Sequence, residues 1–210
     1  MIKHVSLKHG WYYHFRIHSE KARVLCKNNH TKLKDFLYKT FENCPGEHFE
    51  EGPRSSALKF PINVSLKEEF NHEVSTLCMQ GLKNMPQYKT SHSKVQMFML
   101  QFDKNTISME IPIWLFKEEY DDFEKIFKTT QPLSGHIDVL RIEDDEKIWI
   151  WDYKPNAQKE KYAATQVYFY ALMLSKRTGV PIENIRCGYF DENIAYSFKP
   201  AQNVLNQIYF

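Results

Sequence analysis

The spacing of apolar residues along this chain predicts most of its secondary structure. Some segments have the spacing of helices, and others are the short apolar runs of strands. Two segments place apolar residues at helical intervals of three and four, which predicts two helices. They are residues 30–42, through Leu33, Phe36, Leu37 and Phe41, and residues 65–85, through Leu66, Phe70, Val74 and Leu77, with Ser65 as the expected N-cap. Proline and glycine gather at residues 45–61, which predicts a loop between the two helices.

The rest of the chain is dominated by short runs of β-branched and aromatic residues, which are typical of strands. The predicted strands are residues 95–102, 107–116, 135–142 and 148–154, followed by a last hairpin of residues 185–190 and 194–198. Residues 117–129 predict a short exposed helix, and residues 158–178 predict a long helix that ends at Gly179. This order predicts an α/β fold with a central mixed β-sheet flanked by helices.

Charge divides the chain unevenly, although the formal net charge is only +2. Residues 1–60 carry 11 Lys and Arg against 6 Asp and Glu, together with six of the nine histidines. This basic, aromatic N-terminal part is compatible with a polyanionic partner, but a solvated basic face is the commoner explanation. Its segment "HGWYYHFRIH" could stack on a single nucleic-acid strand. A strand packed on the core is the favoured interpretation, because Trp and Tyr are also core residues.

Several function classes are disfavoured by what the sequence lacks. The four cysteines are at least 18 residues apart, so a zinc ribbon or a disulfide-stapled fold is not expected, and free buried thiols are. The N-terminus has no apolar segment of signal-peptide type, and no stretch has the length of a membrane span. We therefore expect an intracellular, soluble protein of 210 residues in a single domain, with residues 95–200 as its functional core.

The strands at 135–142 and 148–154 carry the residues that suggest chemistry. If their turn is centred on Asp145, Asp138 faces Asp152 across the two strands and His136 faces Lys154. Directly opposed residues have Cβ atoms about 5 Å apart, where two carboxylates repel unless a cation lies between them. Hard carboxylate oxygens suit Mg²⁺ or Mn²⁺.

Lys154 lies one strand step beyond Asp152 on the same face, within reach of whatever the metal binds. A metal ion and a lysine together would polarise a phosphodiester and orient an attacking water. Gly135 leaves room for close approach of backbone or ligand. The alternative is a surface hairpin with charged ends, since acids and lysines are common at strand ends.

The combination of these residues with the following helix resembles the PD-(D/E)xK nuclease superfamily, and within it the RecB-like exonuclease branch. The resemblance covers about residues 110–175 and rests on three motifs, Gly135/Asp138, Asp152/Lys154 and Gln166/Tyr170. It implies a restriction-endonuclease-like core and a nuclease.

The resemblance also implies a role for each motif residue. Asp138 and Asp152 would bind the metal, with the backbone carbonyl of Tyr153 as a third ligand. Lys154 would position the attacking water and stabilise the phosphorane. Gln166 would anchor Lys154 or a phosphate, with Tyr170 one helical turn away. Without the other motifs, Gln166 and Tyr170 would be assigned to an ordinary amphipathic helix.

Two further residues are weaker candidates. Glu110, an acid inside an apolar strand, belongs either to the site or to an edge strand facing water. RecB-like members commonly carry a metal-binding histidine on an upstream helix, and His72 fits that place better than His92, in a predicted loop, or His30, too far upstream. An iron–sulfur cluster, which some members hold, is not expected, because only Cys187 follows the motifs.

The sequence therefore favours a Mg²⁺- or Mn²⁺-dependent deoxyribonuclease, acting on DNA that is single-stranded or has free ends. Two alternatives stay open. One is a nucleic-acid-binding module of the same fold without catalysis, and the other is a related ribonuclease. The sequence does not separate exonuclease from endonuclease, nor does it give the oligomeric state.

Overall fold

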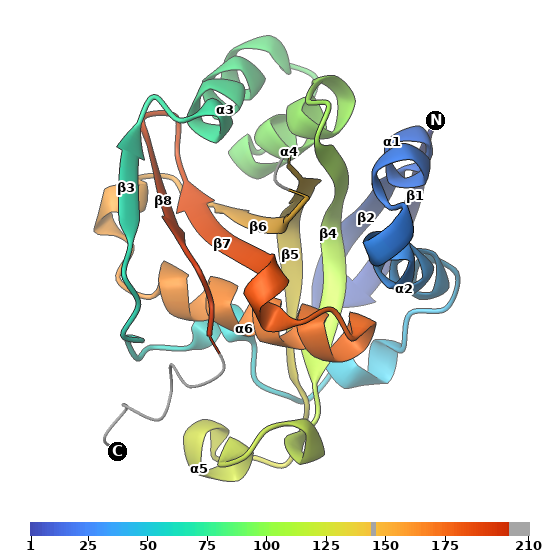
Figure 1. Ribbon diagram of the computed structural model, residues 1–210, viewed down its shortest axis with the longest axis vertical. Coiled ribbons are helices and arrows are strands. Elements are labelled where there is room, and N and C mark those ends of the chain that lie inside the picture. The colour runs from blue at the N-terminus through green and yellow to red at the C-terminus, as the bar shows by residue number, and fades with distance from the viewer. Residues whose placement is uncertain (144–145, 202–210) are drawn as a thin grey trace.

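The computed structural model describes residues 1–143 and 146–201 and builds them around one eight-stranded sheet (Figure 1). The strands lie in the order β1-β2-β4-β5-β6-β7-β8-β3. Their bounds are β1 Ile2–His9, β2 Trp11–His18, β3 Lys67–Phe70, β4 Thr106–Leu115, β5 Leu133–Ile142, β6 Ile148–Tyr153, β7 Ile185–Phe190 and β8 Ile194–Phe198. β6 and β7 are parallel and the other neighbours pair antiparallel. The predicted mixed α/β sheet is therefore confirmed.

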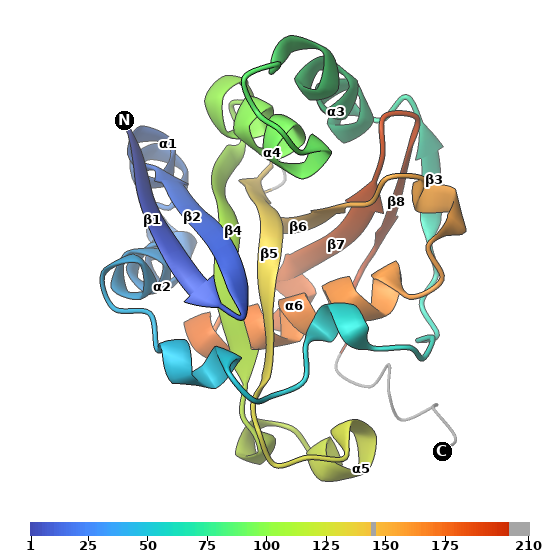
Figure 2. The ribbon, with the colours of Figure 1, turned by 180° about the vertical axis from the view of Figure 1, so that it is seen from behind.

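Helices cover both faces of the sheet, as Figures 1 and 2 show. On one face lie α1 (Ser19–Leu25), α2 (Thr31–Glu42) and α6 (Ala163–Thr178), and on the other lie α3 (Glu73–Asn84) and α4 (Ser91–Phe102). The short α5 (Phe123–Phe127) extends from the end of β4 and β5. Because both faces of the sheet are covered, its central strands β4 and β5 are buried at almost every position.

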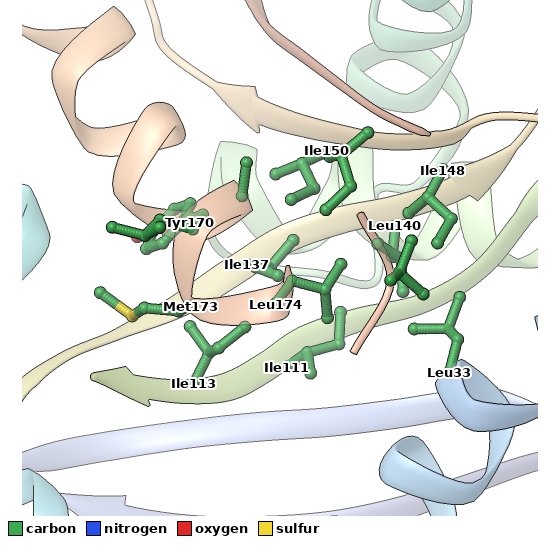
Figure 3. Packing of buried hydrophobic residues seen from close by; sticks show 14 of the residues in the cluster. Leu33, Ile111, Ile113, Ile137, Leu140, Ile148, Ile150, Tyr170, Met173 and Leu174 are labelled. Carbon is green, nitrogen blue, oxygen red and sulfur yellow. The ribbon is translucent and has the colours of Figure 1, made fainter. Parts of the chain in front are cut away.

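The main core fills the space between α6 and the sheet. Figure 3 shows Tyr170 and Leu174 of α6 beside Ile137 of β5, all of them almost completely shielded from solvent. Because α6 connects the parallel strands β6 and β7, its apolar face is held against the sheet by the crossover itself. The helix ends at Gly179, which has a φ of 66° as a left-handed cap, as the sequence predicts.

One predicted strand is wrong: residues 95–102 belong to α4, not to a strand. The run "VQMFMLQF" is buried along most of its length, and a short apolar run of this kind has no period that separates strand from helix. The signal lies upstream, where the Thr90 side chain accepts a hydrogen bond from the backbone N–H of Ser93 at 3.1 Å. That N-cap begins the helix in a segment expected to be a loop.

The predicted helix at 65–85 is also wrong in its first part. Residues Lys67–Phe70 form β3 and pair with β8, and the helix α3 starts only at Glu73 after its N-cap His72. Asn71 makes the break with a φ of 57°. Pairing to a distant strand overrides the local helical period here, which no local pattern can foresee.

The remaining helix predictions differ only in their bounds. Residues 30–42 form α2 as expected. The segment 117–129 contains the 3-10 turn Lys117–Glu119 and α5 instead of one helix. The segment 158–178 begins with the 3-10 turn Ala157–Lys159 before α6 starts at Ala163.

Arg141 of β5 forms a buried charged cluster on the α3–α4 face. Its side chain is fully buried, and its Nε lies 2.9 Å from Oδ2 of Asp103, which is also buried. Its other two nitrogens contact Glu143 at 2.6 Å and Glu73 at 2.7 Å. The guanidinium therefore ties β5 to the ends of both α3 and α4, and three carboxylates offset its desolvation.

Removing this cation should destabilise the fold strongly, because Asp103 would be left buried without its partner. We expect Arg141→Met to lower the free energy of unfolding by about 3–5 kcal/mol in urea denaturation. The matched control is Arg23→Met, whose exposed, solvent-screened pair with Glu20 should contribute far less to stability. Equal destabilisation of the two variants would contradict the assigned role of Arg141.

Candidate active site

The candidate site lies where β5 and β6 separate. The predicted register holds at the closed end, where Leu140 pairs with Ile150 and Val139 with Trp151. Beyond that pair β5 stays with β4, whereas β6 continues along β7, and the separation is visible in Figure 2. Asp145, the expected centre of the turn, lies outside the described residues.

Asp138 and Asp152 are the first residues beyond the last pair, so they lie where the two strands begin to separate. We call this place, with Asp138, Asp152 and Lys154, the fork. The backbone N–H of Tyr153 donates to Oδ2 of Asp138 at 3.0 Å, and that of Lys154 donates to the carbonyl of Phe190 at 2.9 Å. The Asp138 carboxylate thus accepts a backbone N–H of β6 at the point where the β5–β6 ladder ends. This hydrogen bond joins the two arms of the fork through one functional group.

Asp152 is held on the α6 side of the sheet by two groups, Lys154 and Gln166. Its Oδ2 lies 2.7 Å from Nζ of Lys154, and its Oδ1 accepts from Nε2 of Gln166 at 3.3 Å. The same amide donates to the Tyr170 hydroxyl at 2.7 Å. The structure thus brings Asp152, Lys154, Gln166 and Tyr170 together. Gln166 donates to Asp152, whereas the family resemblance suggested that it would anchor Lys154 or a phosphate.

Gly135 permits the close packing of α6 beside the site. A Cβ at this position would lie 2.5 Å from Cε1 of Tyr170, which is too close for any real side chain. The close approach expected at Gly135 is therefore made by the Tyr170 ring. Its hydroxyl is thereby fixed at hydrogen-bonding distance from Gln166.

Glu110 enters the site through a break in the alternation of β4. Met109 and Val139 form one strand pair, Ile111 and Ile137 form another, and Glu110 lies between them with a φ of 55°. The first pair packs among residues under α3 and α4, whereas the second belongs to the α6 core. β4 lies between β2 and β5, so the water-facing edge strand considered for Glu110 is wrong. Its carboxylate accepts from Nε2 of Gln96 at 2.7 Å.

Asp138 and Glu110 have raised pKa values, and the charge of Asp152 contributes to both. Burial, followed by the charges of Asp152 and Glu110, raises the pKa of Asp138 well above its usual value. Burial and the charge of Asp152 also raise the pKa of Glu110, against the hydrogen bond from Gln96. The site is therefore a concentration of mutually repelling carboxylates that a cation would relieve.

Lys154 is the cation that the chain itself supplies. Burial alone would favour the neutral amine, but Asp152 and Asp138 outweigh it and raise the pKa of Lys154 above its ordinary value. The lysine is thus an ammonium throughout the physiological range. The Tyr170 hydroxyl, buried beside Asp152 and Asp138, has a strongly raised pKa and stays a neutral donor or acceptor.

Among the histidines, His92 lies at the site and His72 does not. Nε2 of His92, in the first turn of α4, is 3.9 Å from Oδ2 of Asp138, and its ring packs edge-on to Tyr153. His72 caps α3 by accepting from the backbone N–H of Val74 at 3.2 Å, beside the Trp151 ring. The sequence favours His72 only because the segment around His92 is predicted to be a loop. The Thr90 cap is the signal that could place His92 on a helix.

His136 does not face Lys154, because the strands have already separated at that position. It pairs instead with Pro112 of β4, its Nε2 lies 2.9 Å from Nδ1 of His9, and its ring stacks on Tyr13 at 3.6 Å. The predicted register therefore fails from Asp138 onward, because Val139 with Trp151 is the last strand pair. The sequence pattern predicts the register of the β5–β6 pairs near the turn, but not the residue at which the two strands separate.

The donor set of the fork fits a hard divalent cation. Within the described residues, no group of three His, Cys, Asp or Glu side chains is arranged so that it could hold a metal ion. However, the fork gathers hard oxygen donors: Asp138 and Asp152, with Glu110 near enough for its charge to act on Asp138. Lys154 already contacts Oδ2 of Asp152 at 2.7 Å, and the remaining carboxylate oxygens are ligands of the kind that Mg²⁺ or Mn²⁺ prefers.

The four cysteines carry free thiols, with Cys26, Cys78 and Cys187 buried and Cys44 half-buried. Burial raises the pKa of Cys26 to about 12, and that of Cys44 to about 12 as well. These thiols are therefore protonated and unreactive near neutral pH.

In the described part of the chain, no helix is long and apolar enough to cross a membrane.

Comparison with known proteins adds one match to this geometry. The family model of the PD-(D/E)XK nuclease superfamily matches residues 65–205, which is more than half of the chain. Neither the curated proteins nor the solved structures give a match. Nucleases of this superfamily typically use divalent metal ions. The eight-stranded mixed sheet, its flanking helices and the Asp–Asp–Lys fork agree with that match, and the chain belongs to the PD-(D/E)XK nuclease superfamily, with its restriction-endonuclease-like fold.

Proposed function

We propose that the protein is a metal-dependent deoxyribonuclease that hydrolyses phosphodiester bonds in DNA that is single-stranded or has free ends. The single observation that supports this proposal is the fork, where Asp138, Asp152 and Lys154 converge at the point where β5 and β6 separate. A RecB-like exonuclease is the favoured form, on the strength of the Gln166 and Tyr170 arrangement beside Asp152.

Asp138 and Asp152 would hold a Mg²⁺ or Mn²⁺ ion, with the Tyr153 backbone carbonyl as a third oxygen and Glu110 as a further carboxylate. When bound, the ion would lower the pKa of water and neutralise charge on the scissile phosphate. Lys154, fixed by Asp152, would orient the attacking water and stabilise the negative charge of the phosphorane. Gln166 and Tyr170 would keep Asp152 and Lys154 in that geometry.

His92 replaces His72 in our proposal for the upstream metal ligand. Burial lowers the pKa of His92, against the attraction of Asp152, so its ring is neutral and able to bind a cation at neutral pH. The ring lies 3.9 Å from Asp138, and a small rotation would bring it to an ion held by that carboxylate.

Loss of the ammonium at the fork should abolish most cleavage without unfolding the protein. We expect Lys154→Ala to reduce cleavage of labelled single-stranded DNA in Mg²⁺ or Mn²⁺ by about 10²–10³-fold, and Asp152→Ala by at least as much. Gln166→Ala should reduce cleavage roughly 10-fold, because it acts through Asp152. The control is Lys159→Ala, an exposed lysine five residues downstream, which should cut normally.

The same assay separates the alternatives. Binding of DNA without cutting in any divalent metal would support the non-catalytic module, and preferential cutting of RNA would support a ribonuclease. Cutting of linear but not circular DNA would support an exonuclease. Full activity of Lys154→Ala would sink the proposed mechanism.

Removing the charge of Asp138 should stabilise the metal-free protein. A raised pKa in the folded state means that wild type loses stability as pH rises from about 4 through the folded pKa. Asp138→Asn should therefore melt at a higher temperature than wild type at pH 7–8, with a difference that shrinks as the pH falls toward 4. The control is Asp35→Asn on the exposed side of α2.

Adding Mn²⁺ to the same melts tests the ligand role. The midpoint of wild type should rise more than that of Asp138→Asn, because the variant has no charged ligand at this position. Equal rises in the two proteins would show that Asp138 does not bind the metal.

The two histidines should respond oppositely to truncation. We expect His92→Ala to raise the Mn²⁺ concentration for half-maximal cleavage by roughly 10-fold, with little change in melting temperature. His72→Ala should leave the metal requirement unchanged and destabilise the fold by about 1 kcal/mol through loss of its helix cap. The reverse pattern would restore His72 as the ligand.

A further inference from the structure

The N-terminal hairpin β1–β2 has two chemically different faces. Alternation puts Val5, Leu7, Phe15 and Ile17 on its inner face, where they join the core, and Phe15 and Ile17 are fully buried. The opposite side carries the pair Ile2 with His18, both half-buried, and then the pairs His4 with Arg16, Ser6 with His14 and Lys8 with Tyr12. We call the last three pairs the outer face, and every residue in them is exposed except the half-buried Arg16.

The outer face is basic and hydrogen-bonding throughout. Neither strand contains an Asp or a Glu, and the first acid of the chain is Glu20. Nε2 of His4 and Nδ1 of His14 lie 3.2 Å apart, and the Ser6 hydroxyl lies within 3.3 Å of both. Burial and Arg16 lower the pKa of both rings, so at neutral pH they are uncharged donors and acceptors between the cations Lys8 and Arg16.

The tip of the hairpin carries two large aromatic side chains that the core does not use. Trp11 is 76% exposed and Tyr12 is 62% exposed, next to the sharp turn at Gly10. Packing against the core, the favoured interpretation of this segment from sequence, holds for Phe15 but not for these two residues. Exposed aromatic rings beside cations are the groups on which unpaired bases stack.

The hairpin lies close to the fork in the sheet, since β2 neighbours β4 and β4 neighbours β5. β2 joins the sheet by pairing Arg16 with Met109 of β4, and farther along Tyr13 stacks on His136, two residues from Asp138. In Figure 2 the hairpin lies toward the viewer with α1 and α2 behind it, on the side from which α4 and the opening between β5 and β6 are also seen. Glu110 and Asp138 are near enough to Tyr13 for their charges to add to burial in raising its pKa.

We propose that the outer face of the β1–β2 hairpin is a binding track for single-stranded nucleic acid, which it guides toward the fork between β5 and β6. Tyr12 would stack on an unpaired base, and Lys8 and Arg16 would contact phosphates. Ser6, His4 and His14 would offer neutral hydrogen bonds between these cations. A duplex would be bound less tightly, because its bases are already stacked within the helix.

This inference deepens the proposed function and rests on it, because it assigns the substrate strand to a surface. The hairpin lies outside residues 65–205, so the family match does not account for it. Charge complementarity selects the partner: the face carries cations and no carboxylate, and a nucleic-acid strand is a regular polyanion with stacking surfaces.

Equilibrium binding without catalysis tests the track directly. Fluorescence anisotropy of a labelled oligothymidylate would be measured in EDTA, so that no strand is cut. We expect Tyr12→Ala to weaken binding by roughly 5- to 100-fold, the range that removal of one stacked base implies. The matched control is Phe70→Ala on β3, since Phe70 is also 62% exposed but lies at the opposite edge of the sheet.

The charged part of the track is tested by its salt dependence. Lys8→Glu should weaken binding and reduce the slope of log Kd against log salt concentration by about 0.7 for each phosphate that Lys8 neutralises in wild type. Lys176→Glu, an exposed lysine of α6 on the other face of the sheet, makes the same change in net charge and should bind as wild type does.

The results separate this proposal from the nuclease proposal. Equal binding by Tyr12→Ala and Phe70→Ala, or tighter binding of duplex than of single strand, would overturn the track whatever the enzyme cuts. Tyr12-dependent binding by a protein that cuts nothing in any divalent metal would support the track and refute the nuclease.

Discussion

Electrostatic repulsion among Asp138, Asp152 and Glu110 is the constraint around which this structure is organised. Three carboxylates lie close enough to raise the pKa of Asp138 and Glu110, in surroundings too buried for water to screen them fully. Lys154 lies 2.7 Å from Asp152, and the charge of Arg16 acts on Glu110. Three acids against these two cations leave room for a further positive charge, and this imbalance underlies our proposal of a divalent ion.

The sheet creates this arrangement by opening. β5 and β6 pair as far as Val139 and Trp151, and beyond that pair β5 stays with β4 and β6 with β7. Asp138 and Asp152, the next residue of each strand, therefore lie where no ladder hydrogen bonds join the two strands. α6 can support Asp152 through Gln166 only because Gly135 lets the Tyr170 ring lie against β5. The buried Arg141 cluster ties the closed end of the same strand to α3 and α4. The site thus lies where strand pairing is lost, between the packing of α6 on one side and the Arg141 cluster on the other.

Much of the candidate site could be predicted because its residues are close in sequence. Asp138, Asp152, Lys154, Gln166 and Tyr170 belong to three consecutive elements, whose order and approximate register follow from alternation and turn position. His92 could not be placed in this way. It comes from α4, whose buried apolar run has no distinctive period, and its approach to Asp138 depends on how that helix packs on the sheet.

The sequence by itself determined the α/β class, most helix and strand identities from residue 106 onward, and the set of acids, lysine and amide that the fork assembles. Those features follow from local patterns of burial, where side-chain period and the direction of each strand are enough. Only the tertiary structure decided that Lys67–Phe70 is an edge strand, that β5 parts from β6 at Asp138, and that the hairpin tip leaves Trp11 and Tyr12 exposed. Each of these depends on contacts between segments far apart in the chain, and the free energy of such contacts is not encoded in the neighbouring residues.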